Sequence, residues 1–232
     1  MFHQVTVILS HTSHPGNIGS CARAMKNMGF SKLILVNPKD YPNFQATSMA
    51  SGAHDILQKA EVVSSLTEAL KPFHYIIAAS ARHRTLPWPM MPVETMAHNL
   101  VEKLVSPACE VALLFGNEQS GLSNDELRAS DWHCYIPTDE AYPSLNLSQA
   151  VQVMTYELRK TFLKAQVQAP KESQPPMKAS FEKMEGFYEH LTQTLQHLDI
   201  FNPNQPRQLL ARLRRLFNRA EMDETEINIL RG

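Results

Sequence analysis

Short, apolar runs rich in β-branched residues alternate with stretches of helical periodicity along the first 163 residues. The segments that follow the runs, such as 17–28 and 146–163, carry apolar residues at three- and four-residue spacing. The runs predict strands at residues 5–9, 32–36, 61–63, 75–79, 111–115 and 132–136. Apolar strands that alternate with helices are typical of a parallel sheet covered on both faces. The pattern therefore predicts an α/β fold for residues 1–163.

The remainder of the chain has a different pattern. Residues 164–180 contain three prolines, several Gln and Lys and no aromatic residue, and we interpret them as a linker. Residues 181–198, 205–219 and 223–230 each show helical periodicity. We therefore expect a small helical C-terminal region at 181–232, of a size at which an isolated core is marginal.

Composition limits the function classes. The 232 residues are 43% hydrophobic, with 22 Lys plus Arg against 23 Asp plus Glu, so a packed core is expected and any nucleic-acid site must be a local patch. The three cysteines form no CxxC pair, which argues against a disulfide framework. No secretion signal and no run of about 20 apolar residues is visible. We expect a cytoplasmic protein with no membrane partner.

The loops that follow the predicted strands are the expected ligand-binding positions, because ligands of open α/β sheets bind beyond the carboxyl ends of the strands. None of these loops carries a dinucleotide fingerprint. The loop at 116–123 has the glycine spacing of a phosphate-binding loop, but Leu122 replaces the required Lys. His11 and His14 lack a nearby carboxylate or Cys, so no metal site is predicted. Loops rich in Gly, Ser and Asn suit a small polar ligand, or are ordinary turns and helix caps.

Arginine is placed where it could contact phosphate. Arg23, Arg82 and Arg84 are expected at the carboxyl edge of the sheet, where guanidinium groups can bind phosphates bidentately. The predicted helix at 205–219 carries five arginines from Arg207 onward and no acid. Both groups are either phosphate contacts or solvated surface charges.

Three segments, taken in order, are more specific than any single loop. They are NIGSCARAMKNMG at 17–29, LFGNEQSGL at 114–122 and SLNLSQAV at 144–151. Together they resemble the three ordered motifs of the SPOUT superfamily of methyltransferases, and within it the TrmH-type ribose 2′-O-methyltransferases. The stretch SARHRTLPWP at 80–89 resembles the TrmJ branch, which methylates nucleotide 32 of the tRNA anticodon loop. The resemblance covers residues 5–163 and, more loosely, the helical tail.

The resemblance implies S-adenosylmethionine as the methyl donor and tRNA as the substrate. It also implies a deep trefoil knot in the last part of the α/β domain and a homodimer whose active sites lie at the interface. The residues that match the family's donor pocket are Ala79, Ser80, Ala81, Gly116, Ile136, Pro143, Ser144 and Leu145.

The family's catalytic, acceptor-side residues match Asn17, Arg23, Glu118, Ser144 and Asn146. A guanidinium is very hard to deprotonate in a protein, so Arg23 is a poor general base. We expect it to stabilise the developing alkoxide or to hold the adjacent phosphate. The expected RNA contacts are Arg82, Arg84, Arg212, Arg215 and Arg219.

The implied function is methylation of the ribose 2′-oxygen of cytidine or uridine at position 32 of tRNA, with S-adenosylmethionine as donor. Two alternatives remain on the same fold. The chain could methylate another tRNA position or ribosomal RNA, or it could be a non-catalytic RNA-binding protein. The joint presence of Asn17, Arg23, Glu118 and Asn146 favours catalysis.

Overall fold

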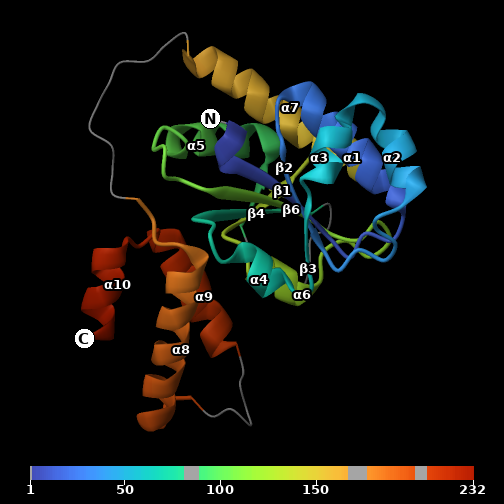
Figure 1. Cartoon of the computed structure of the whole chain (residues 1–232). Helices are drawn as coiled ribbons and strands as arrows, with labels where there is room; N and C mark the ends of the chain where they lie inside the picture. The colour runs from blue at the N-terminus through green and yellow to red at the C-terminus, as the bar shows by residue number, and fades with distance from the viewer. Residues whose placement is uncertain (1, 81–88, 167–176, 202–207) are drawn as a thin grey trace.

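The computed structural model describes residues 2–80, 89–166, 177–201 and 208–232 (Figure 1). A central sheet is covered by helices on both faces, and a separate group of helices extends from one edge of this domain. Ala81, Arg82 and Arg84 lie outside the described residues, as does most of the stretch at 80–89.

The sheet has seven strands in the order β3-β2-β1-β6-β4-β7-β5, and all of its neighbouring pairs are parallel. The predicted parallel α/β sheet is therefore confirmed. The strand missed by sequence is β5, which is only three residues long, contains a proline and lies at the edge of the sheet. The strands are β1 Val5–Ser10, β2 Lys32–Val36, β3 Glu61–Val63, β4 Tyr75–Ala79, β5 Met90–Pro92, β6 Val111–Phe115 and β7 Trp132–Tyr135.

Alternate residues of the central strands enter two different cores. In β1, Val7 and Leu9 point to the face covered by α1, α5 and α7, whereas Ile8 points to the face of α4 and α6. This two-sided burial explains why the strands are apolar without interruption. The helices of the domain are α1 Pro15–Met28, α2 Phe44–Ala50, α3 His54–Gln58, α4 Leu66–Leu70, α5 Val93–Lys103, α6 Asn124–Arg128 and α7 Leu147–Gln166, with short 3₁₀ turns at Phe2–Gln4 and Ser51–Ala53.

The helices α2 and α3 were not predicted from the sequence. The buried face of α2 consists of Ala46 and Ala50, so its apolar pattern is weak, and α3 is five residues long. Both pack beside α1. Small residues allow this close approach, and Gly19 of α1 lies directly against the backbone of α2.

The C-terminal region forms a helical unit of α8 Phe181–His197, α9 Leu209–Ala220 and α10 Glu224–Arg231. It has a small core of its own, which includes Met184, Phe187 and Ile227. The predicted linker at 164–180 differs from the structure at both ends, because α7 continues to Gln166 and Lys178 is buried against the sheet. Among the helices of the described ranges, none has the length and apolar run that crossing a bilayer requires.

The contact at Gly19 gives a stability prediction. A Cβ at this position would lie 2.0 Å from the carbonyl oxygen of Ala46, so Gly19→Ala forces α1 and α2 apart. We expect a loss of about 1–3 kcal/mol, as for other overpacked cores, and a fall in Tm of roughly 2–12 °C. Gly52→Ala is the control, because no atom lies within 4 Å of its added Cβ. Equal Tm values for the two variants in a thermal melt would contradict this prediction.

Candidate active site

A pocket opens at the carboxyl ends of β4, β6 and β7. Its volume is about 850 Å³ including the open mouth. Glu118 is the only charged residue among the described residues that line it. The described members of the predicted donor set all line this pocket: Ala79, Ser80, Gly116, Ile136, Pro143, Ser144 and Leu145.

The loop after β6 folds back on itself and forms one wall of the pocket. The backbone N–H of Gly121 donates to the carbonyl of Asn117 at 2.8 Å, and Gly121 has a positive φ of 67°. A Cβ on Gly116 would lie 2.3 Å from the backbone of Gly121, so this tight turn requires glycine. Asn117 joins this loop to the loop after β1, because its Nδ2 donates to the carbonyl of His11 at 2.7 Å.

Glu118 is the centre of a hydrogen-bond network between two loops. Its carboxylate accepts from the backbone N–H of Ser13 at 2.9 Å, from Ser13 Oγ at 2.8 Å and from Asn17 Nδ2 at 2.9 Å. Burial by itself raises the pKa of Glu118, but these hydrogen bonds outweigh it and hold the pKa below its ordinary value. Glu118 is therefore a fixed negative charge at neutral pH and is unsuited to act as a general acid.

A third loop joins this network through Asn146. Its Nδ2 donates to Asn17 Oδ1 at 3.2 Å. Its Oδ1 accepts from the backbone N–H of Ser148 at 2.9 Å, at the start of α7. Asn17, Glu118 and Asn146 thus form one hydrogen-bonded group beside the pocket, and Ser144 lies in the pocket wall.

Arg23 is not part of this group within one chain. It lies six residues after Asn17 on α1, which is about 9 Å along the helix axis and on a different face. Its side chain is exposed, and it forms no hydrogen bond or ion pair with any other residue of the described ranges. The structure therefore places Arg23 outside the pocket of its own chain. The expectation that the active sites lie at a dimer interface stays a prediction.

The predicted RNA contacts in α9 differ in exposure. Arg212 and Arg219 are exposed, seven residues apart and on the same face of the helix, and Arg215 between them is half-buried. These arginines belong to the helical unit, which contacts the sheet where β4 and β7 begin, at the opposite ends of the strands from the pocket.

Ser13 and Asn117 are site residues that sequence reasoning missed. Both lie in loops already expected to carry ligands, and Asn117 is inside the second motif. Their contacts depend on β1 lying next to β6 in the sheet, which no local pattern reveals.

Comparisons with known proteins agree with this geometry. Residues 4–156 match the SpoU rRNA Methylase family, and residues 182–232 match the C-terminal domain of the tRNA methyltransferase TrmJ. The chain is 44% identical to the tRNA (cytidine/uridine/adenosine-2′-O-)-methyltransferase TrmJ of Pseudomonas aeruginosa, over 100% of this chain and 93% of the relative. It is 45% identical to the tRNA (cytidine/uridine-2′-O-)-methyltransferase TrmJ of Sodalis glossinidius, over 100% and 90% of the two chains.

Solved structures extend the match to the whole fold. The crystal structure of TrmJ from Z. mobilis ZM4 superimposes with a TM-score of 0.83 at 31% identity, over 98% of this chain and 96% of that one. A probable methylase family protein from Haemophilus influenzae matches with a TM-score of 0.68 at 35% identity, over 100% and 94% of the two chains. Because both parts of the chain match family models and the relatives align over at least 90% of their length, the chain belongs to the SpoU family of methylases and, within it, to the TrmJ group of 2′-O-methyltransferases.

Proposed function

We propose that this protein transfers a methyl group from S-adenosylmethionine to the ribose 2′-oxygen of cytidine or uridine at position 32 of the tRNA anticodon loop. The observation that carries the proposal is the pocket at the ends of β4, β6 and β7, bordered by the hydrogen-bonded group Asn17, Glu118 and Asn146. The TrmJ names of the full-length relatives support tRNA as the substrate. The expected place of action is the cytoplasm.

The residues of the pocket fit this donor. Ile136 and Leu145 offer apolar walls for an adenine ring, and the tight loop at Gly116 brings backbone groups to the pocket surface. No Lys or Arg is among the described lining residues, which disfavours a phosphate-bearing nucleotide. The ionised Glu118 carboxylate suits a ligand that carries positive charge.

The chain's own residues mainly orient the reactants. When bound, S-adenosylmethionine supplies an electrophilic methyl group on a positively charged sulfur. Glu118 and Asn146 fix the side-chain amide of Asn17 from both sides, so its orientation is set before RNA arrives. Positioning the ribose oxygen for in-line attack supplies most of the rate enhancement in this mechanism.

Arg23 completes the site from a second copy of the chain. Because Arg23 is exposed and lies outside its own pocket, we expect a homodimer in which it reaches the partner's active site. There its charge stabilises the developing alkoxide or holds the adjacent phosphate. We also propose the trefoil knot that the family implies, with α7 returning to pack between α1 and α5 after β7.

The reaction is tested by methyl transfer to unmodified tRNA transcripts, with products digested and mapped by mass spectrometry. We expect a 2′-O-methyl group at nucleotide 32, and a loss of about 10²–10³ in kcat for Arg23→Ala. Lys26→Met on the same helix is the control, since Lys26 pairs with Asp55 on the surface. Methylation at another nucleotide would overturn the assignment of position 32, and absence of transfer to any tRNA would refute the substrate.

Subunit mixing tests whether the active site is shared between two chains. Arg23→Ala and Glu118→Gln are each expected to be nearly inactive alone. After they are mixed and allowed to exchange subunits, about one quarter of wild-type activity should return, because half of the dimers are mixed and one of their two sites is intact. A mixture that stays inactive while native mass spectrometry shows mixed dimers would place Arg23 in its own chain's site.

Charge reversal tests the RNA contact of α9. The double variant Arg212→Glu and Arg219→Glu should weaken tRNA binding and reduce the slope of log K against log salt by about 2, because two phosphate contacts are lost. The control is Lys59→Glu with Lys164→Glu, which makes the same change in net charge on the exposed surface of the other domain. Filter binding at several salt concentrations measures both. Equal slopes for the two double variants would remove α9 from the RNA interface.

A further inference from the structure

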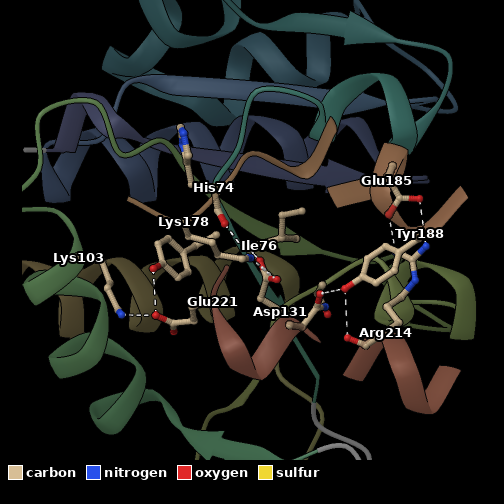
Figure 2. A network of polar contacts seen from close by, with 12 residues as sticks. His74, Ile76, Lys103, Asp131, Lys178, Glu185, Tyr188, Arg214 and Glu221 are labelled. Carbon is tan, nitrogen blue, oxygen red and sulfur yellow. Dashed lines mark hydrogen bonds and ion pairs between the residues drawn. The ribbon is translucent and has the colours of Figure 1, made fainter. Parts of the chain in front are cut away.

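The helical unit is attached to the sheet through a buried ion pair (Figure 2). Lys178, just before α8, donates from Nζ to Asp131 Oδ1 at 2.5 Å and to the carbonyl of His74 at 2.9 Å. The two charged side chains are only 3% and 8% exposed. The ammonium group also lies 5.1 Å from the centre of the Tyr75 ring. Lys178 therefore has three favourable partners in a site from which water is largely excluded.

Asp131 is held in place by the sheet itself. Its Oδ2 accepts from the backbone N–H of Ile76 at 2.9 Å, and its own N–H donates to the carbonyl of Ile76 at 2.8 Å. Asp131 thus joins the start of β7 to β4 independently of the tail. The sheet domain thus orients the Asp131 carboxylate, and the segment before α8 supplies Lys178 as its ion-pair partner.

A second polar contact fixes the rotation of the unit about this point. Glu221, at the C-terminal end of α9, accepts from Tyr75 Oη at 3.2 Å and forms an ion pair with Lys103 of α5 (Figure 2). The backbone N–H of Phe181 also donates to the carbonyl of Phe73 at 2.8 Å across the interface. The unit therefore contacts the sheet domain at several separate points and not at the ion pair alone.

The basic helix α9 is rigidly connected to this attachment. Arg214 of α9 forms a two-point ion pair with Glu185 of α8 and lies 4.2 Å from the centre of the Tyr188 ring (Figure 2). Tyr188 Oη in turn donates to Asn218 Oδ1 at 2.6 Å. The Arg214 side chain thus contacts residues of the helical unit, whereas Arg212 and Arg219 are exposed to solvent.

A polar attachment of this kind favours one orientation over others. Two apolar surfaces can pack in several relative orientations. A buried charge, in contrast, costs free energy unless the oppositely charged group lies at the right position. The exposed pair of Lys183 with Glu224, at 3.9 Å and with side chains 54% and 63% exposed, has no such requirement. The buried pair therefore specifies geometry as well as contact.

We propose that Lys178 and Asp131 are positioning residues for the RNA substrate. By holding the helical unit in one orientation, they fix the exposed arginines of α9 relative to the pocket at the other end of β4 and β7. When RNA is bound at the pocket, a rigidly held α9 is present at a high effective concentration near the same RNA. A loosely tethered α9 would have a lower effective concentration. This inference rests on the proposed tRNA methylation.

The test uses Lys178→Met in the full chain, which keeps the length of the side chain and removes its charge. Hydrogen exchange at the amide of Phe181, which bonds across the interface, should rise by at least about tenfold, while the amides of β1 and β6 are unchanged. The KM for tRNA should rise by about 5–20-fold with kcat within about twofold. The Kd for S-adenosylhomocysteine, measured by calorimetry, should not change, because the pocket lies at the other strand ends.

Lys183→Met is the matched control, since it makes the same substitution but removes an exposed ion pair within the helical unit. Glu221→Gln is a milder second variant that weakens the contact with Tyr75 and Lys103, and it replaces Lys178→Met if that protein fails to fold. It should raise the KM for tRNA in the same direction.

Two results would overturn the inference. Faster exchange at Phe181 with an unchanged KM for tRNA would make the pair a docking contact without a role in RNA positioning. A parallel loss of S-adenosylhomocysteine affinity would indicate general destabilisation of the domain. Failure of the wild-type protein to methylate any tRNA is a separate outcome, because it refutes the proposed function while the exchange data still decide whether Lys178 holds the unit in place.

Discussion

The position of β6 between β1 and β4 is the constraint on which the site depends. Parallel pairing on both sides of β6 brings the loops after β1, β4 and β6 to one edge of the sheet. Glu118 lies in the loop after β6 and therefore meets Ser13 and Asn17, which come from the loop and helix after β1. A different strand order would separate these groups by at least one strand spacing, about 4.8 Å, and break the hydrogen bonds. The strand order thus determines which loops meet and therefore which of their side chains can form hydrogen bonds.

The two ends of β4 and β7 serve different purposes. Their carboxyl ends carry Ala79, Ser80 and Ile136 in the pocket, whereas the residues at their amino ends receive the helical unit through Tyr75 and Asp131. A strand of five residues separates these ends by roughly 17 Å. The candidate active site and the attachment of the helical unit therefore lie at opposite ends of the same two strands. The helical unit has only about fifty residues and a small core of its own, so its contacts with the larger domain add to its stability.

Charge is used differently at these two ends. Glu118 is half-buried, and its negative charge is stabilised by neutral N–H and O–H donors, so the carboxylate keeps its net charge. Asp131 is almost completely buried and is neutralised by Lys178, so that pair has no remaining net charge to offer a ligand. A carboxylate thus keeps its net negative charge where its donors are neutral groups, and it becomes part of a neutral ion pair where its donor is an ammonium group.

The sequence by itself determined the elements that depend on local pattern. Strand and helix periodicity predicted six of the seven strands, and the three ordered motifs indicated the methylase family and the residues of the pocket. It missed α2, α3 and β5, which are short and have weak apolar periodicity. Only the tertiary structure decided that Ser13 contacts Glu118, that Arg23 lies outside its own pocket and that Lys178, within a predicted linker, is buried. These features depend on which residues meet across long stretches of chain. Local periodicity carries no record of such pairings, because they are set by strand order and by the docking of helices on the sheet.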